Sequence, residues 1–81
     1  MSRISKTLKE TNVFRFKNEP MLYFICRIKP STRLPGEKMF KIIREDGTID
    51  WLDECEMVDV DDTTVRKYNP DTDIDFYGLD M

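Results

Sequence analysis

The sequence contains no histidine. Histidine is the commonest general base and metal ligand in proteins, so its absence excludes Ser–His and Cys–His nucleophile pairs. Only three glycines are present, and they are scattered, which leaves no glycine-rich phosphate loop. Carboxylates are plentiful, but a chain of 81 residues offers little cleft in which one carboxyl pKa rises above another. We therefore expect no enzymatic activity and no catalytic residues.

Cysteine is also scarce. Cys26 and Cys55 are too few for a disulfide framework, and no Cys-x-x-Cys spacing supports zinc. We expect buried free thiols, with a disulfide between the two as the alternative. The aspartates of residues 71–75 match the start of a calcium-binding EF-hand loop, but Phe76 stands where the loop requires glycine. The sequence therefore predicts neither a metal site nor a cofactor.

Long apolar runs are absent. No segment approaches the ~18 to 20 apolar residues of a membrane span, and the first residues lack a signal-peptide core, so we expect a cytoplasmic protein. The length predicts one small domain. Residues 13–70 are interpreted as a single β domain, 1–12 as a basic arm or short helix, and 71–81 as an acidic tail. Ile4 and Leu8, four positions apart, would share one face of that helix or anchor the arm.

The apolar residues occur in short blocks typical of strands. Residues 13–16 read as a strand and 17–20 as a turn. Residues 21–28 form the strongest apolar run, which favours a central strand covered on both faces. Residues 29–38 contain two prolines and a glycine and are predicted to form a loop.

Residues 39–44 and 49–52 read as the two strands of a hairpin. Asp46 and Gly47 between them predict a type I′ turn, which requires positive φ at both central positions. Ile49 and Trp51 would share one face of the returning strand, and we expect Trp51 to pack in the core.

The remaining segments are less decisive. Residues 53–62 fit either a short strand or a single helical turn. Residues 62–68 favour a capped helical turn, because Asp62 or Thr63 can accept from free backbone N–H groups, and Asn69-Pro70 would end it. The tail is either an edge strand or an exposed peptide.

The order of strand, loop and hairpin across residues 21–60 resembles that of small SH3-like barrels of the Tudor type. The resemblance implies a binding domain, and its aromatic cage for methylated side chains would nominate Tyr23, Phe40 and Trp51. These three lie within apolar runs, which favours core packing over a ligand role. The expected fold is mainly β, a small SH3-like barrel or a strongly curved antiparallel sheet with short helical elements.

Charge is distributed very unevenly along the chain. Residues 1–44 hold eleven basic residues against three acidic ones, a balance of +8, whereas residues 45–81 hold two against thirteen, a balance of -11. The division falls inside the predicted hairpin, so pairing of its strands would place basic residues 39–44 beside acidic residues 49–54. Part of the asymmetry is then neutralised internally.

The acidic half favours a protein partner with a basic surface, because complementary potentials steer association. The tail resembles short peptides with which replication proteins dock on sliding clamps or single-strand-binding partners. In size and charge the chain resembles phage or mobile-element proteins that block or retune a host replication, transcription or defence factor, which would place it in the host cytoplasm. The leading hypothesis is a non-catalytic acidic protein-binding module or inhibitor. Its assigned contact residues are Asp53, Glu54, Glu56, Asp59, Asp61, Asp62, Asp73, Asp75, Phe76, Tyr77 and Leu79.

The basic half supports an alternative, a nucleic-acid-binding SH3-like or OB-like barrel. Its cations would neutralise phosphates while interleaved aromatics offer stacking platforms. The residues assigned to this role are Arg3, Lys6, Lys9, Arg15, Lys17, Arg27, Lys29 and Arg33. An accessory subunit of a larger assembly is a third reading, and the oligomeric state is left open.

Overall fold

The computed structural model, which describes residues 7–74 and 76, contains one open sheet of five antiparallel strands in the order β4-β3-β2-β1-β5. The strands are β1 (Asn12–Phe16), β2 (Tyr23–Pro30), β3 (Lys38–Arg44), β4 (Ile49–Asp53) and β5 (Val60–Lys67). A 3-10 helix, Glu54–Met57, connects β4 to β5. The expected mainly β fold is confirmed.

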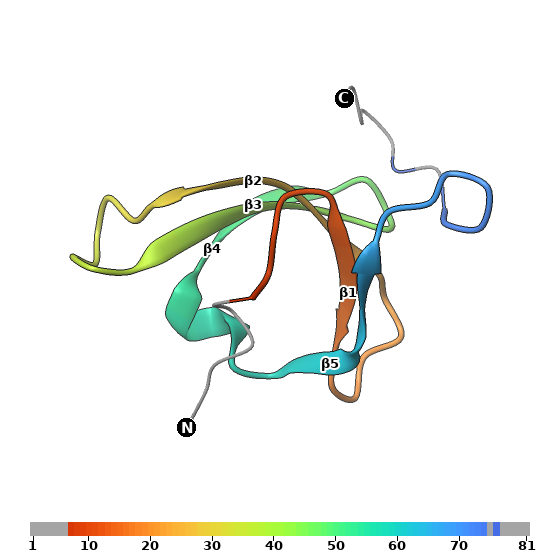
Figure 1. Ribbon diagram of the computed structural model, residues 1–81, viewed down its shortest axis with the longest axis horizontal. Coiled ribbons are helices and arrows are strands. Elements are labelled where there is room, and N and C mark those ends of the chain that lie inside the picture. Colours follow the sequence, from red (N-terminus) through yellow and green to blue (C-terminus); the bar gives the residue numbers. More distant parts are fainter. Residues whose placement is uncertain (1–6, 75, 77–81) are drawn as a thin grey trace.

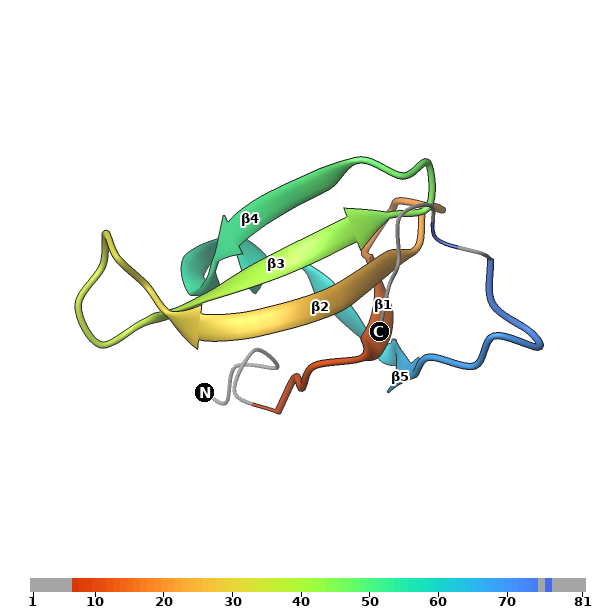
Figure 2. The same ribbon diagram turned by 90° about the horizontal axis from the view of Figure 1, so that it is seen from above.

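The sheet is strongly bent. Figure 1 shows β2, β3 and β4 running across the top of the molecule while β1 and β5 descend steeply from them, and Figure 2 shows β1 and β5 crossing beneath. Register shifts occur between Val13 and Arg15 on β1 and between Ile25 and Arg27 on β2, and such bulges increase local twist. The bend encloses an inner core, which comprises Leu8, Phe14, Tyr23, Ile25, Phe40, Ile42, Met57 and Val60.

A second cluster covers part of the opposite side of the sheet. This outer cluster contains Val13, Leu22, Phe24, Ile43 and Phe76, with Cys26 and Tyr68 packed against it. The ring of Phe24 lies 5.1 Å from that of Tyr68 and 5.6 Å from that of Phe76, measured between centroids. Since Tyr23 and Ile25 face the inner core, β2 is buried on both faces at this end, as predicted for a central strand.

The hairpin β3–β4 is confirmed, but its predicted turn type is wrong. Gly47 N–H donates to the Arg44 carbonyl (2.8 Å), and Arg44 N–H donates to the Thr48 carbonyl (2.8 Å). Only Gly47 has positive φ (91°) in this turn, so a type I turn followed by a left-handed glycine connects the strands. The Asp46 carboxylate accepts the Thr48 N–H (2.9 Å), a local bond typical of aspartate in such turns.

The helical turn expected over residues 62–68 is also wrong, because residues 62–67 belong to β5. The strand pairs with β1, where Asn12 lies opposite Lys67 and Val13 opposite Arg66. The polar residues that suggested a helix cap support the irregular part of this pairing instead. Thr64 Oγ1 accepts the Arg15 N–H (2.9 Å) at the bulge. Tertiary pairing therefore overrides the local capping signal.

The two ends of the chain bear on alternatives that the sequence leaves open. Residues 7–11 form no helix, and Leu8 is buried in the inner core; Ile4 lies outside the described residues. Residues 71–74 form no strand, while Phe76 is fully buried in the outer cluster. No helix in the described part of the chain has the length and apolar character needed to cross a membrane.

Both cysteines are free thiols, so the alternative of a disulfide between them is not realised. Cys26 is partly buried against the outer cluster, but Cys55 is exposed, and the expectation that it is buried is wrong. Cys55 lies on the 3-10 helix, where Glu54 and Met57 are the buried positions. Burial raises the pKa of the Cys26 thiol, which therefore stays protonated and is a weak nucleophile at neutral pH.

Candidate functional site

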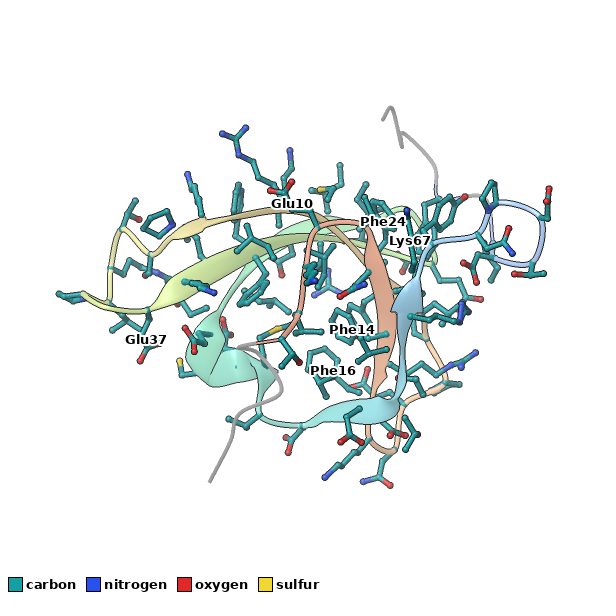
Figure 3. All side chains as sticks on the ribbon, viewed as in Figure 1. Glu10, Phe14, Phe16, Phe24, Glu37 and Lys67 are labelled. Carbon is teal, nitrogen blue, oxygen red and sulfur yellow. The ribbon has the colours of Figure 1, made fainter. Side chains whose placement is uncertain are left out.

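The outer side of β2, β3 and β4 carries a surface that the outer cluster leaves uncovered. We call it the basic face and define it as Arg27, Lys29, Lys41 and Trp51. Lys41 lies opposite Arg27 on one neighbouring strand and opposite Trp51 on the other. Lys29 Nζ lies 4.6 Å from the centroid of the Trp51 ring. Figure 3 shows nitrogen-tipped side chains standing above β2 on this side of the molecule, near Glu10.

Strand alternation explains this arrangement. Phe40 and Ile42 belong to the inner core, so Lys41 between them points to the outer side of β3. On β2, the register shift after Ile25 inserts one extra residue, Cys26, and brings Arg27 opposite Lys41. Cys26 stays on the outer side, where its thiol donates to the Lys41 carbonyl (3.4 Å). The bulge thus adds a cation to the outer face.

Within the described part of the chain, the cations of the basic face form no ion pair with an acidic residue. The ion pairs among residues 7–74 and 76 join Arg33 to Asp53, Arg44 to Asp50 and Arg66 to Asp73. Like charges opposite each other on neighbouring strands are destabilising. Arg27 and Lys41 stand in this relation, so their placement is unfavourable for stability.

Trp51 is not a core residue, contrary to expectation. It is half-buried on the outer face, while its neighbour Leu52 packs against the inner core. Ile49 shares the outward orientation and is 52% exposed. Tyr23 and Phe40 are inner-core residues on the other side of the sheet, so the three nominated aromatics do not converge into a cage. Figure 3 shows Phe14 and Phe16 also pointing into the enclosed interior.

Three acids assigned to a protein-docking surface are bonded to other parts of the chain, and two of them, Asp53 and Glu54, are buried. Asp53 is buried, forms an ion pair with Arg33 and accepts the Ser31 hydroxyl (3.4 Å). Glu54 is buried and accepts the Lys38 N–H (3.1 Å). Glu56 accepts the Asp53 N–H (2.7 Å), which tethers the 3-10 helix to the end of β4. These carboxylates hold the loop, the helix and β3 together.

The other docking candidates are divided. Asp61 accepts the N–H and hydroxyl of Thr63 (3.1 and 2.7 Å). Asp73 has no exposed side-chain surface, pairs with Arg66 and accepts the Asn69 N–H (2.6 Å). Phe76 is buried, whereas Asp59 and Asp62 are exposed. Asp75, Tyr77 and Leu79 lie outside the described residues. The candidates that the structure describes are not gathered into one surface.

Carboxylates elsewhere in the chain serve the backbone in the same way. The further bonds of this kind run from the N–H of Leu22 to Glu45 (2.9 Å), of Ile28 to Glu10 (3.0 Å) and of Trp51 to Asp50 (2.8 Å). A charge-assisted acceptor satisfies a backbone donor better than a neutral one. Many carboxylates of the chain therefore form hydrogen bonds within the fold.

Three aspartates that accept backbone N–H groups, Asp46, Asp50 and Asp61, have lowered pKa values. The Arg44 guanidinium and the Trp51 N–H lower the pKa of Asp50. The Thr48 hydroxyl and N–H lower the pKa of Asp46, and those of Thr63 lower the pKa of Asp61. Each bond favours the ionised carboxylate.

These lowered pKa values predict sensitivity to acid. A carboxyl group whose pKa is lower in the folded chain stabilises the fold above its unfolded pKa, and this contribution is lost as the pH falls through the folded pKa. We expect the urea midpoint, followed by circular dichroism, to fall as the pH drops below about 4, the unfolded pKa of aspartate. The variant Asp46→Asn/Asp50→Asn/Asp61→Asn should show a shallower decline over the same pH range. A decline as steep as that of the native chain would contradict the assignment.

The cations selected from the sequence are scattered. Lys29 belongs to the basic face, as does Arg27. Arg15 Nε donates to the Pro20 carbonyl (2.9 Å), and Arg33 is held by Asp53. Lys9 and Lys17 are exposed outside the basic face, while Arg3 and Lys6 lie outside the described residues. Sequence reasoning missed Lys41, although its position between Phe40 and Ile42 is the signal of an outward-facing residue.

A cavity of about 270 Å³ opens on the inner side of the sheet. Its lining includes Tyr23, Glu19, Arg44 and Asp59. The Tyr23 hydroxyl donates to Glu19 (3.0 Å), and burial together with this acceptor raises the pKa of Tyr23. Arg44 pairs with Asp50 (3.1 Å). The charged residues that line this cavity are of both signs, whereas the charged residues of the basic face are all cations.

Residues 7–74 and 76 contain no group of three or more His, Cys, Asp or Glu side chains placed to hold a metal ion. Comparison with protein-family models, with curated proteins and with solved structures finds no match to the chain. The functional argument therefore depends on the geometry and charge of the basic face.

Proposed function

We propose that the protein is a non-catalytic nucleic-acid-binding module and that the basic face is its contact surface. The observation that carries this proposal is the cluster of Arg27, Lys29 and Lys41 around a half-exposed Trp51, in which no cation is ion-paired with a described acidic residue. Phosphate neutralisation by Lys and Arg supplies most of the affinity for nucleic acid, and aromatic side chains add contacts to bases.

The acidic side chains support this choice over the docking of a basic protein. Asp53, Glu54 and Glu56 bind the chain's own backbone or Arg33, so their charges are partly compensated within the fold. The cations of the basic face have no such compensation among the described residues. A phage-encoded inhibitor that docks on a basic surface, and an accessory subunit, stay predictions of the sequence alone.

The SH3-like resemblance is part of the same proposal. The strand, loop and hairpin that carried it correspond to β2, the segment between β2 and β3, and the β3–β4 hairpin. The strong curvature of the five-stranded sheet supports the likeness. A small curved β module of this kind offers an open face for binding, and we propose no catalysis for it.

The test compares two variants of equal net charge. Arg27→Gln/Lys29→Gln/Lys41→Gln removes the basic face, and Lys17→Gln/Lys38→Gln/Lys67→Gln removes three exposed cations outside it. Affinities for labelled single-stranded and duplex DNA are measured by fluorescence anisotropy over a salt series. We expect the first variant to lose binding on the order of tenfold or more at ~100 mM salt, with a salt slope smaller by about 2. The control variant should stay within about threefold of the native chain, because its charges act only at long range.

Two results would contradict the proposal. Equal losses in both variants would mean that affinity follows net charge rather than the basic face. The absence of binding to either DNA by the native chain at ~100 mM salt would reject nucleic acid as the partner and return attention to the acidic residues. Unfolding midpoints measured for each variant separate loss of binding from loss of fold.

A further inference from the structure

Trp51 occupies an unusual position among the aromatic residues. The ring-to-ring contacts in the described part of the chain join Phe14, Phe16 and Tyr23 in one group and Phe24, Tyr68 and Phe76 in another. Trp51 takes part in none of these pairs. The ammonium of Lys29 lies 4.6 Å from the centroid of the Trp51 ring. The indole therefore contacts a cation and belongs to neither aromatic group.

We infer that the basic face selects single-stranded nucleic acid, with one base stacking on Trp51 in place of Lys29 and the released ammonium binding a neighbouring phosphate. This inference rests on the proposed function and names its substrate class. Stacking of a base on an aromatic ring is stronger than a solvent-exposed cation–π contact, so the exchange is favourable. Lys29 exchanges an aromatic partner for an anionic one.

The geometry of the row favours a flexible strand. Arg27, Lys41 and Trp51 occupy matching positions on β2, β3 and β4, and neighbouring strands lie about 4.8 Å apart. Phosphates over Arg27 and Lys41 would therefore lie beside a base over Trp51. In a duplex the bases are paired and stacked, so a base can reach the ring only after it leaves the helix. A single strand presents its bases without that cost.

Two acids delimit the basic face. Glu10 accepts the Ile28 N–H at one side of β2, and Asp53 lies opposite Met39 at the far end of β4. Glu10 is held in place by the backbone, whereas the charge of Asp53 is compensated by Arg33. Phosphates are repelled beside Glu10 and attracted over the cations of the basic face, which directs the strand across Lys41.

Trp51 is the only tryptophan in the chain, so its fluorescence reports directly on this site. The probes are a short oligodeoxythymidine, a duplex of the same length and inorganic polyphosphate, which carries phosphates without bases. We expect oligodeoxythymidine to quench Trp51 emission and to bind on the order of tenfold more tightly than the duplex. Polyphosphate should bind with little quenching.

Substitutions at the ring separate stacking from charge. Trp51→Leu should weaken the binding of labelled oligodeoxythymidine on the order of tenfold, since a base loses its stacking partner. The same variant should bind polyphosphate about as tightly as the native chain, because no cation is removed. Trp51→Phe, which restores an aromatic face, should recover part of the loss. Lys29→Gln should weaken the binding of both probes.

The outcomes distinguish this inference from the proposed function. Equal affinity for duplex and single strand, with no effect of Trp51→Leu, would overturn the inference while nucleic-acid binding stands. Binding of polyphosphate alone would overturn both, as would failure of all three probes to bind. Thermal unfolding of each variant checks that the half-buried position tolerates the substitution.

Discussion

Replacement of Phe40 by alanine should lower the free energy of unfolding by about 3 to 5 kcal/mol, the usual cost of truncating a buried phenylalanine. Phe40 is fully buried on β3, between Ile28 of β2 and Leu52 of β4. A domain of this length has a total stability of about 4 to 12 kcal/mol. We therefore expect a large fall in the urea midpoint, measured by circular dichroism, and substantial unfolding at physiological temperature.

Ile49→Ala provides the matched control in the same hairpin. Ile49 is 52% exposed on the outer side of β4, so it loses little burial on truncation. We expect its unfolding free energy to change by less than about 1 kcal/mol. Equal effects of the two substitutions would show that the inner core does not lie where β3 and β4 place it.

Replacement of Phe76 by alanine should cost about 3 kcal/mol. The ring is 1% exposed, and its centroid lies 5.6 Å from that of Phe24 and 5.8 Å from that of Tyr68. Removal of the ring would uncover the outer cluster beside β2. The unfolding free energy is measured by urea titration at neutral pH.

The neighbouring residue Ile74 tests the same segment without the core contact. It is 39% exposed, and Ile74→Ala should change stability by less than about 1 kcal/mol. If Phe76→Ala proved as mild as Ile74→Ala, this residue would not anchor the tail to the domain. The alternative of an exposed docking peptide for residues 71–81 would then regain its support.

The strands were predictable where an apolar block is bounded by turn-forming residues. The run at residues 21–28 and the hairpin around Asp46-Gly47 combine apolar blocks with turn chemistry, and both appear as β2 and β3–β4. Trp51 was not predictable, because Ile49, Trp51 and Leu52 are all apolar and the alternation does not say which of them faces inward. Pairing with β3 determines the orientation, because Leu52 lies opposite the inner-core residue Phe40 and Trp51 therefore faces the outer side.

The spatial arrangement of charged residues was predictable only along the β3–β4 hairpin. The expected apposition of basic and acidic strands is confirmed by the ion pair between Arg44 and Asp50 (3.1 Å). The basic face was not foreseen as a unit, because it requires the bulge at Cys26 and the juxtaposition of three strands. Long-range bonds such as that of Glu10 to the Ile28 backbone likewise depend on tertiary placement.

The carboxylates along β4 have a consequence for how copies of the chain meet. β4 ends the open sheet, and unpaired N–H groups on such a strand are a template for adding a strand from another molecule. Here the Trp51 and Asp53 N–H groups already donate to Asp50 and Glu56, which also place negative charge along this margin. A second chain that approaches β4 finds these two N–H groups occupied, and the carboxylates repel the carbonyl oxygens of that chain. The β4 edge is therefore a poor template for edge-to-edge growth into aggregates.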